Sequence, residues 1–271
     1  MQSRKGPNKT LTMGLFQPIA DAIKLLSKEA NLNSKSNFVE FIITPNLNII
    51  CSLVIWITIP IIHEFGFIKI GILFILRCIS LNTIIVMKIS WSSNSNYAYI
   101  GIMRSVAQMI SYEINFIIVI MIIISLIERL RLTTILEPPV PLIWTTFPLI
   151  LAWFLTILAE TNRTPFDFAE GESELISGFN VEYGGPSFII LFLAEYSRIL
   201  FMRILTVYLF TSLKGATIIF YTLYLAICVA FIWIRATMPR FRYDKLMKIN
   251  WTQILPVTTL IMFASFPAKI Y

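Results

Sequence analysis

Residues that could hold a redox cofactor or a metal are scarce in this chain, which has three cysteines and one histidine among 271 residues. Cys51, Cys78 and Cys228 each stand alone inside an apolar run, and no two have the spacing of metal ligands. We interpret them as small buried hydrophobic residues, and His63 as a helix-end residue at the membrane surface. We therefore expect no haem, zinc or iron–sulfur site held by this chain alone, and assign no catalytic or metal-binding residue.

Charged residues are also few, at 14% of the chain, whereas hydrophobic residues make up 57%. Soluble domains have about 25% charged and roughly 45–50% apolar residues. Apolar runs long enough to cross a bilayer recur, and the opening MQSRKGPNKT has no apolar core of a cleavable signal peptide. The composition predicts an all-α fold, a polytopic transmembrane helix bundle without a cleaved leader.

The apolar runs divide the chain into about seven predicted spans. The third span reaches full length only if it extends back through Glu113 and Gln108. We expect an interfacial segment over residues 1–45, the bundle over 46–271, and an acidic loop over 160–185. The predicted spans are residues 46–62, 65–88, 104–127, 141–159, 188–210, 216–235 and 251–267.

The interfacial segment contains PIADAIKLLSKEA, which has the pattern of an amphipathic helix. Pro18 suits the first helical turn. Apolar residues Ile19, Ile23 and Leu26 share one face, and charged residues share another. Thirteen residues are too few to cross a bilayer, so this helix should lie in the interface. It is either an anchor or one wall of a site for an amphiphilic ligand.

Basic residues are distributed unevenly between the two sides that seven spans define. The side of the N-terminus carries 14 of the 22 Lys and Arg, the opposite side carries five, and three lie within spans. The positive-inside rule places the N-terminus and the acidic loop in the cytoplasm or the mitochondrial matrix, and the C-terminus on the opposite side.

Six of the 15 acidic residues lie in the stretch AETNRTPFDFAEGESELISGFNVEY, between two apolar spans. Thr164 is a candidate helix N-cap with Pro165 in the first turn, and Asp167 would favour that helix start. Such capping accounts for one or two of the six acids. We therefore expect the remaining acidic residues of this stretch to have a functional role.

Glutamates inside the predicted spans are candidate functional residues, because burying a charge in a membrane costs at least ~2.5–3.5 kcal/mol. Counted from the predicted span starts, Glu113 lies roughly 13 Å deep and Glu195 roughly 10 Å deep, while Glu160 closes the fourth span. Carboxylates clustered at low dielectric cannot all ionise, so some should exchange protons near neutral pH. The alternative is a structural ion pair. Arg198 is the expected partner of Glu195 on the same helix face, and Arg203 a second.

Several strings together resemble one family along essentially the whole chain. They are RKGPNK, QPIADAIKLLSKE, WSSNSNYA, RSVAQMISYE, AEYSRILFM, RATMPRFRYDKLM and, most specifically, ETNRTPFD with EGESEL and GFNVEY. They are similar to the quinone-site membrane subunit of respiratory complex I, subunit 1 or the H-type subunit of NADH:ubiquinone oxidoreductase.

The resemblance implies a subunit that forms the quinone-access channel and couples quinone reduction to proton translocation through buried carboxylates. Ubiquinone is then a substrate, and the redox centres lie in other subunits. The implied proton pathway contains Glu113, Glu160, Asp167, Glu170, Glu172, Glu174, Glu182 and Glu195. The implied quinone-binding residues are Asp21, Lys24, Arg104 and Arg163, and the implied interface with the hydrophilic arm contains Arg4, Arg240, Arg242 and Asp244.

The resemblance also implies the partners and the location. We expect other complex I subunits of both arms and membrane lipid as partners, no nucleic acid, and the mitochondrial inner membrane as location, with the acidic loop on the matrix side. The family has a transmembrane helix before RKGPN, whereas this sequence begins at Met1. We therefore expect a separate polypeptide to supply that helix, or the true chain to be longer.

Two alternative functions remain open from the residues. One is the related membrane subunit of an energy-converting hydrogenase, in which the acidic loop serves ferredoxin-linked chemistry. The other is a free-standing ion or proton transporter, which predicts internal repeats and interrupted helices at the midplane. No such repeat is visible in the sequence.

Overall fold

Helices form every regular element in the part of the chain that the structure, a computed structural model, describes. This confirms the predicted all-α class. The described residues are 6–7, 10, 14–29, 34–60, 70–127, 132, 147–168, 178–180, 182–211 and 217–265.

The first bundle helix, α2 (Phe38–Val54), continues as the short 3-10 helix η2 (Ile55–Thr58). It starts eight residues before the predicted start at residue 46, and Pro45 lies inside it. A proline in a helix interior usually breaks or kinks the helix. Inside a membrane bundle, neighbouring helices and polar side chains compensate for the lost hydrogen bond, so proline is tolerated there.

Helices α3 (Gly71–Ser93) and α4 (Asn96–Ile127) are separated by two residues only. Asn94 makes the turn in the left-handed conformation, with φ 50°, and its side chain donates to the carbonyl of Lys35 at 3.1 Å. The segment WSSNSNYA is thus mostly helical, although residues 89–103 lie between the two predicted spans 65–88 and 104–127. At about 48 Å, α4 exceeds the roughly 30 Å hydrocarbon core, so part of it extends beyond the core.

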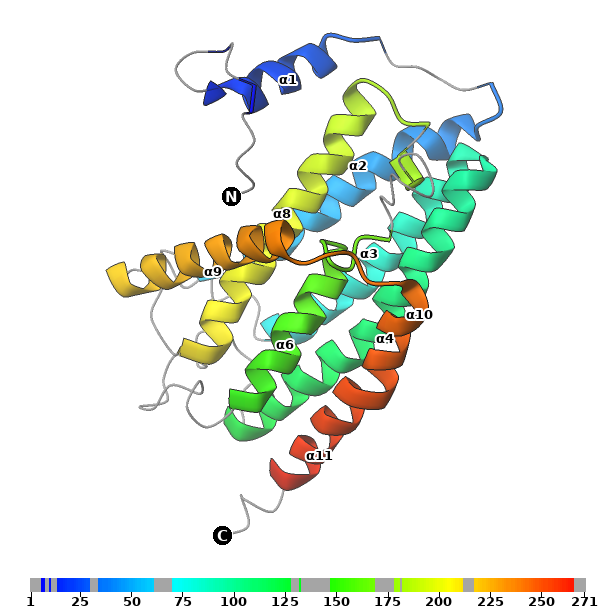
Figure 1. Ribbon diagram of the computed structural model, residues 1–271. Helices are drawn as coiled ribbons and strands as arrows, with labels where there is room; N and C mark the ends of the chain where they lie inside the picture. The colour runs from blue at the N-terminus through cyan, green and yellow to red at the C-terminus, as the bar shows by residue number, and fades with distance from the viewer. Residues whose placement is uncertain are drawn as a thin grey trace.

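The long helix α4 is the centre of the bundle, with α3, α6 (Phe147–Glu160) and α11 (Leu255–Ser265) packed against it. Stacked rings of Phe116 and Trp153, 4.7 Å between centroids, join α4 to α6. On the other side, Asn115 of α4 donates to Asn250, whose own amide donates to the carbonyl of Ser111 at 2.9 Å. Asn250 opens the π-helical turn η5 (Asn250–Ile254), which joins α10 (Tyr243–Ile249) to α11. These two amides therefore fix the C-terminal helices along α4 (Figure 1).

The helix α8 (Pro186–Thr211) lies beside α2 and has α9 (Ile218–Thr237) against it. The indole nitrogen of Trp56 donates to the hydroxyl of Ser197 at 2.9 Å and ties η2 to α8. In contrast, α9 crosses α8 and projects from the bundle (Figure 1). Only 11% of its most apolar window is buried, so most of its surface is left for lipid or another chain.

The amphipathic helix is observed as α1 (Gln17–Leu26), lying across the end of α8 (Figure 1). Ile19, Ile23 and Leu26 on its apolar face are more than half exposed. Gly185, with φ +59°, precedes α8 and comes close to the backbone of Glu29, where a Cβ atom would lie 3.0 Å from the carbonyl oxygen. A residue without a side chain is therefore needed where α1 meets α8.

Four described helices are long and apolar enough to cross a membrane: Phe38–Thr58, Gly71–Ser93, Asn96–Ile127 and Ile218–Thr237. Of the other three predicted spans, α8 has sufficient length but contains Glu195, Arg198 and Arg203. The described helical part of the fourth, α6, has 14 residues, and α11 has 11. The chain is thus a multi-pass membrane protein, and the number seven stays a prediction.

Candidate functional site

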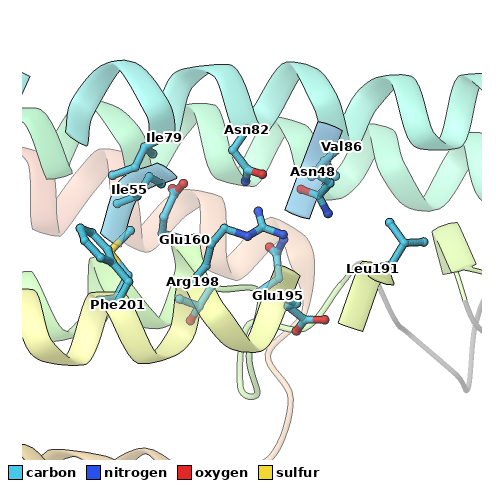
Figure 2. A pocket seen from close by; sticks show the side chains of 13 residues that line it. Asn48, Ile55, Ile79, Asn82, Val86, Glu160, Leu191, Glu195, Arg198 and Phe201 are labelled. Atoms are coloured by element: carbon cyan, nitrogen blue, oxygen red, sulfur yellow. The ribbon is translucent and has the colours of Figure 1, made fainter. Parts of the chain in front are cut away.

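A cavity lined by both polar and apolar side chains lies inside the bundle, where α2, α3 and α8 meet the end of α6 (Figure 2). It offers about 40 Å³ to the centres of water molecules. A single water needs roughly 10–15 Å³ by that measure, so there is room for about three. The lining residues are Asn48, Ile55, Ile79, Asn82, Val86, Glu160, Thr161, Asn162, Leu191, Glu195, Arg198, Phe201 and Met202.

Glu160 enters the cavity from the last position of α6 and is only 7% exposed. Its Oε2 atom has no hydrogen-bond partner in the protein. The C-terminal end of a helix carries a partial negative charge, so it disfavours a carboxylate. Glu160 therefore occupies a position that helix electrostatics and burial both make costly.

Glu195 reaches the same cavity from α8, and its Oε1 atom lies 3.2 Å from a guanidinium nitrogen of Arg163. Both side chains are less than one-fifth exposed. The Arg163 guanidinium also lies 4.7 Å from the ring centroid of Tyr196, a cation–π contact. The turn that follows α6 is thus fixed to α8 by a largely buried charge pair.

Neither arginine predicted to pair with Glu195 does so. Among the described residues, no carboxylate lies within 4 Å of a nitrogen of Arg198, whose Nε donates to the carbonyl of Ala194 at 3.3 Å. Arg203 lies with its guanidinium 4.8 Å from the ring centroid of Phe231 on α9. The prediction was wrong because spacing along one helix ignores the charge that a neighbouring turn supplies.

Arg198 extends into the cavity between Glu160 and Glu195 (Figure 2). Its charge acts on both carboxylates. The site therefore contains two acidic and two basic side chains from α6, the turn after it, and α8.

Glu113 lies next to this cavity on α4, and the hydroxyl of Ser80 on α3 donates to its carboxylate. The charges of Glu113 and Glu160 act on each other. The depth of Glu113 in the membrane cannot be counted from the start of its helix, because α4 begins at Asn96 rather than at residue 104. The end of α6 is level with Gln108, whose amide donates to the carbonyl of Ala159 at 2.9 Å, so Glu113 lies about 7 Å further along α4.

Two uncharged side chains of the cavity, Asn48 and Asn82, escaped the sequence interpretation, which considered only ionisable residues. Their Oδ1 atoms are buried without a hydrogen-bond partner, as is that of Asn162. Buried polar atoms are nearly always satisfied by protein or ordered water. In the sequence, these two residues could have been found as amide side chains inside otherwise apolar helices.

A second, wider cleft of about 620 Å³ lies beside the segment that leads to α10. Arg240, on this segment, pairs with Asp167 at 3.5 Å, and Arg242 pairs with Asp244 at 3.0 Å with both side chains exposed. The predicted arm-interface residues Arg240, Arg242 and Asp244 thus gather here. Arg104, predicted for the quinone path, lines the same cleft.

The helix start predicted at Pro165 is not observed. Residues 164–168 form a turn, a bend and irregular backbone rather than a helix, the bond between Thr164 and Pro165 is cis, and the hydroxyl of Thr164 has no hydrogen-bond partner in the protein. Asp167 is bound by Arg240 instead of favouring a helix start. The sequence alone could not indicate this competing long-range ion pair.

The remaining predicted residues are dispersed. Asp21 and Lys24 are exposed on α1, and Glu182 lies in the turn before Tyr183. The Tyr183 ring stacks on Phe41 with centroids 4.2 Å apart, and its hydroxyl donates to the carbonyl of Ile89 at 2.9 Å. Burial raises the pKa of this phenol. Arg4, His63, Glu170, Glu172 and Glu174 lie outside the described residues.

Comparison with known proteins gives a consistent result over the whole chain. The family model described as NADH dehydrogenase matches residues 1–266. NADH-ubiquinone oxidoreductase chain 1 of Anopheles gambiae is 45% identical over 273 residues, covering 100% of this chain and 87% of the relative. The protein of the same name from Branchiostoma lanceolatum is 42% identical over 273 residues, covering 98% and 86%. That from Coturnix japonica is 44% identical over 267 residues, covering 95% and 82%.

Proposed function

This chain belongs to the NADH dehydrogenase family and is a membrane subunit of respiratory complex I, and we propose that it couples quinone reduction to proton translocation through its buried carboxylates. Ubiquinone is the substrate of the assembled enzyme, and this chain provides part of its access path. The names of the relatives favour this function over that of a hydrogenase subunit or a free-standing transporter.

The observation that carries the proposal is that Glu160 and Glu195 line one cavity inside an apolar bundle. Ionisable residues inside a membrane bundle are costly and usually mark ion or proton pathways. Both carboxylates can accept and release a proton, and both come from rigid helices that hold them in place. The cavity is therefore suited to passing a proton from one helix to the next.

Water completes the proposed pathway. Unsatisfied oxygens of Glu160, Asn48 and Asn82 line the cavity. Two or three waters bound to them would connect the two carboxylates by hydrogen bonds. Glu113, held by Ser80, would be the next acceptor along α4.

The acidic loop would transmit the redox reaction to this pathway. Its first residues are fixed by Arg163 bound to Glu195 and by Asp167 bound to Arg240, and its end is fixed by Tyr183. The attachments at Arg163 and at Tyr183 are made to α8 and α3, two helices that line the cavity. We propose that the remaining acids, Glu170, Glu172, Glu174 and Glu182, carry or respond to protons between quinone and Glu160.

The quinone path itself is proposed at α1 and the cleft beside α10. The exposed apolar face of α1 fits an isoprenoid tail, with Asp21 and Lys24 at its polar edge. Arg104 lines the cleft with Arg240 and Arg242, which would contact the hydrophilic arm. Arg163, predicted to bind quinone, is engaged by Glu195, which favours a role in the proton pathway. The inner membrane with the loop on the matrix side is the corresponding location.

Replacing Glu160 or Glu195 by Gln tests the proposal, because the amide keeps the shape but cannot carry a proton. Each variant of the assembled complex should lose quinone-coupled turnover by about 10²-fold or more, while NADH oxidation with an artificial acceptor persists. The control is Glu40→Gln, which changes an exposed glutamate in the first turn of α2. Normal proton pumping and quinone reduction in both cavity variants would refute the proposal.

A further inference from the structure

We propose that Arg198 is the internal counter-charge of Glu160, and that it positions the proton on this carboxylate during transfer through the cavity. The inference rests on the proposed function and adds a residue to it. It assigns a role to a half-buried cation that has no ion-pair partner within 4 Å among the described residues.

Two of the four charged side chains at the cavity are in direct contact with each other. Glu195 is compensated directly by Arg163 at 3.2 Å. Glu160 and Arg198 line the same cavity without an ion-pair partner within 4 Å among the described residues, and the charge of Arg198 acts on Glu195 more strongly than on Glu160. The charges of Glu160 and Arg198 attract each other, although they are not in direct contact. The four side chains together are electrically neutral when all are ionised.

Glu160 lies where a carboxylate needs a counter-charge. It is almost completely buried at the negative end of α6, and one of its oxygens has no hydrogen-bond partner in the protein. A buried carboxylate without a cation stays neutral, since ionising it in low dielectric is too costly. Arg198 lines the same cavity, and its charge acts on Glu160.

The charge of Arg198 affects how Glu160 binds and releases a proton. When Glu160 accepts a proton from a neighbouring water or carboxyl, one O–H bond forms on Glu160 and one breaks on the donor. The Arg198 charge is then unmatched, which favours release of that proton. Because Arg198 does not bind Glu160 directly, the carboxylate remains accessible to the proton. Arg198 is thus a positioning residue that keeps Glu160 able to both bind and release.

The test compares Arg198→Gln, Arg198→Lys and the control Arg203→Gln in the assembled complex. Arg203 lies on the same helix but outside the cavity, with its guanidinium on the Phe231 ring. We expect Arg198→Gln to lower quinone-coupled turnover by roughly tenfold or more, Arg198→Lys to retain most of it, and Arg203→Gln to remain close to the unmodified complex. Full turnover with Arg198→Gln, or an equal loss with Arg198→Lys and Arg198→Gln, would overturn the inference.

Assembly provides the second readout. Removing one partner of a buried ion pair leaves the other charge uncompensated, which is far more destabilising than removing both. If Arg198→Gln prevents assembly, the double variant Arg198→Gln/Glu160→Gln should restore it, whereas Arg198→Gln/Glu40→Gln should not. Failure of the first double variant to restore assembly would overturn the counter-charge role.

The two proposals fail in different ways. If Glu160→Gln and Glu195→Gln both retain coupling, the proton pathway itself is refuted. If these variants lose coupling while Arg198→Gln retains it, only the role of Arg198 is refuted.

Discussion

Arg163 and Glu195, 32 positions apart in the sequence, form an ion pair of 3.2 Å that joins the turn after α6 to α8. The pair lies at the edge of the cavity and is mostly shielded from solvent. It therefore links the start of the acidic loop mechanically to a helix that carries two ionisable residues of the cavity.

This pair should show strong energetic coupling. Arg163→Gln or Glu195→Gln leaves one buried charge without its partner and should cost about 3–5 kcal/mol, whereas changing both should cost much less than the sum. The temperature at which the purified complex dissociates measures this in a double-mutant cycle. The exposed pair Arg242 and Asp244 is the matched control, where we expect almost no coupling. Additive losses at Arg163 and Glu195 would contradict a direct interaction.

Gln108 should matter for stability rather than for proton transfer. Its amide donates to the carbonyls of Ala159 at 2.9 Å and Phe166 at 3.0 Å, and so fixes the end of α6 and the turn after it. Gln108→Leu leaves both carbonyls without this donor and should destabilise the chain by about 1–3 kcal/mol. Gln253→Leu, on an exposed position of η5, is the control. Equal dissociation temperatures for the two variants would argue against this role.

Glu113 should act as a proton carrier held by Ser80. Glu113→Gln keeps a hydrogen-bond acceptor for the Ser80 hydroxyl but cannot titrate, so coupled turnover should fall by about 10²-fold while assembly persists. Ser80→Ala removes only the hydroxyl that orients the carboxylate and should have a smaller effect. Quinone reductase activity and proton pumping are measured on the same membranes. Normal values with Glu113→Gln would exclude the residue from the pathway.

The acidic loop should respond to the quinone site. Its ends are fixed beside the cavity by Arg163 and by the hydroxyl of Tyr183, so a change at the quinone site should alter the segment between them. Hydrogen exchange of the peptides that contain Glu170, Glu172 and Glu174 should change when a quinone-site inhibitor binds. Peptides from α9, which lies at the periphery of the bundle, serve as the reference. Unchanged exchange in the loop with inhibitor bound would count against this coupling.

Much of the candidate site could be predicted from the sequence because charge inside an apolar span is rare and therefore conspicuous. Glu160 and Glu195 were identified in this way, and both line the cavity. The amides of Asn48 and Asn82 were missed because a neutral polar residue costs less in a helix and gives a weaker signal. The observed start of α2 at Phe38 lies before the predicted span, and Pro45 is tolerated inside the helix.

The sequence by itself determined the class of this protein: hydrophobic runs with few charges require helices, because only helices satisfy their own backbone hydrogen bonds in lipid. It also determined the family, through strings that extend along the chain. Only the tertiary structure decided which charges meet. Arg163 rather than Arg198 binds Glu195, and Arg240 binds Asp167. These choices depend on how each helix is rotated and packed against distant segments, and spacing along one helix contains no information about that.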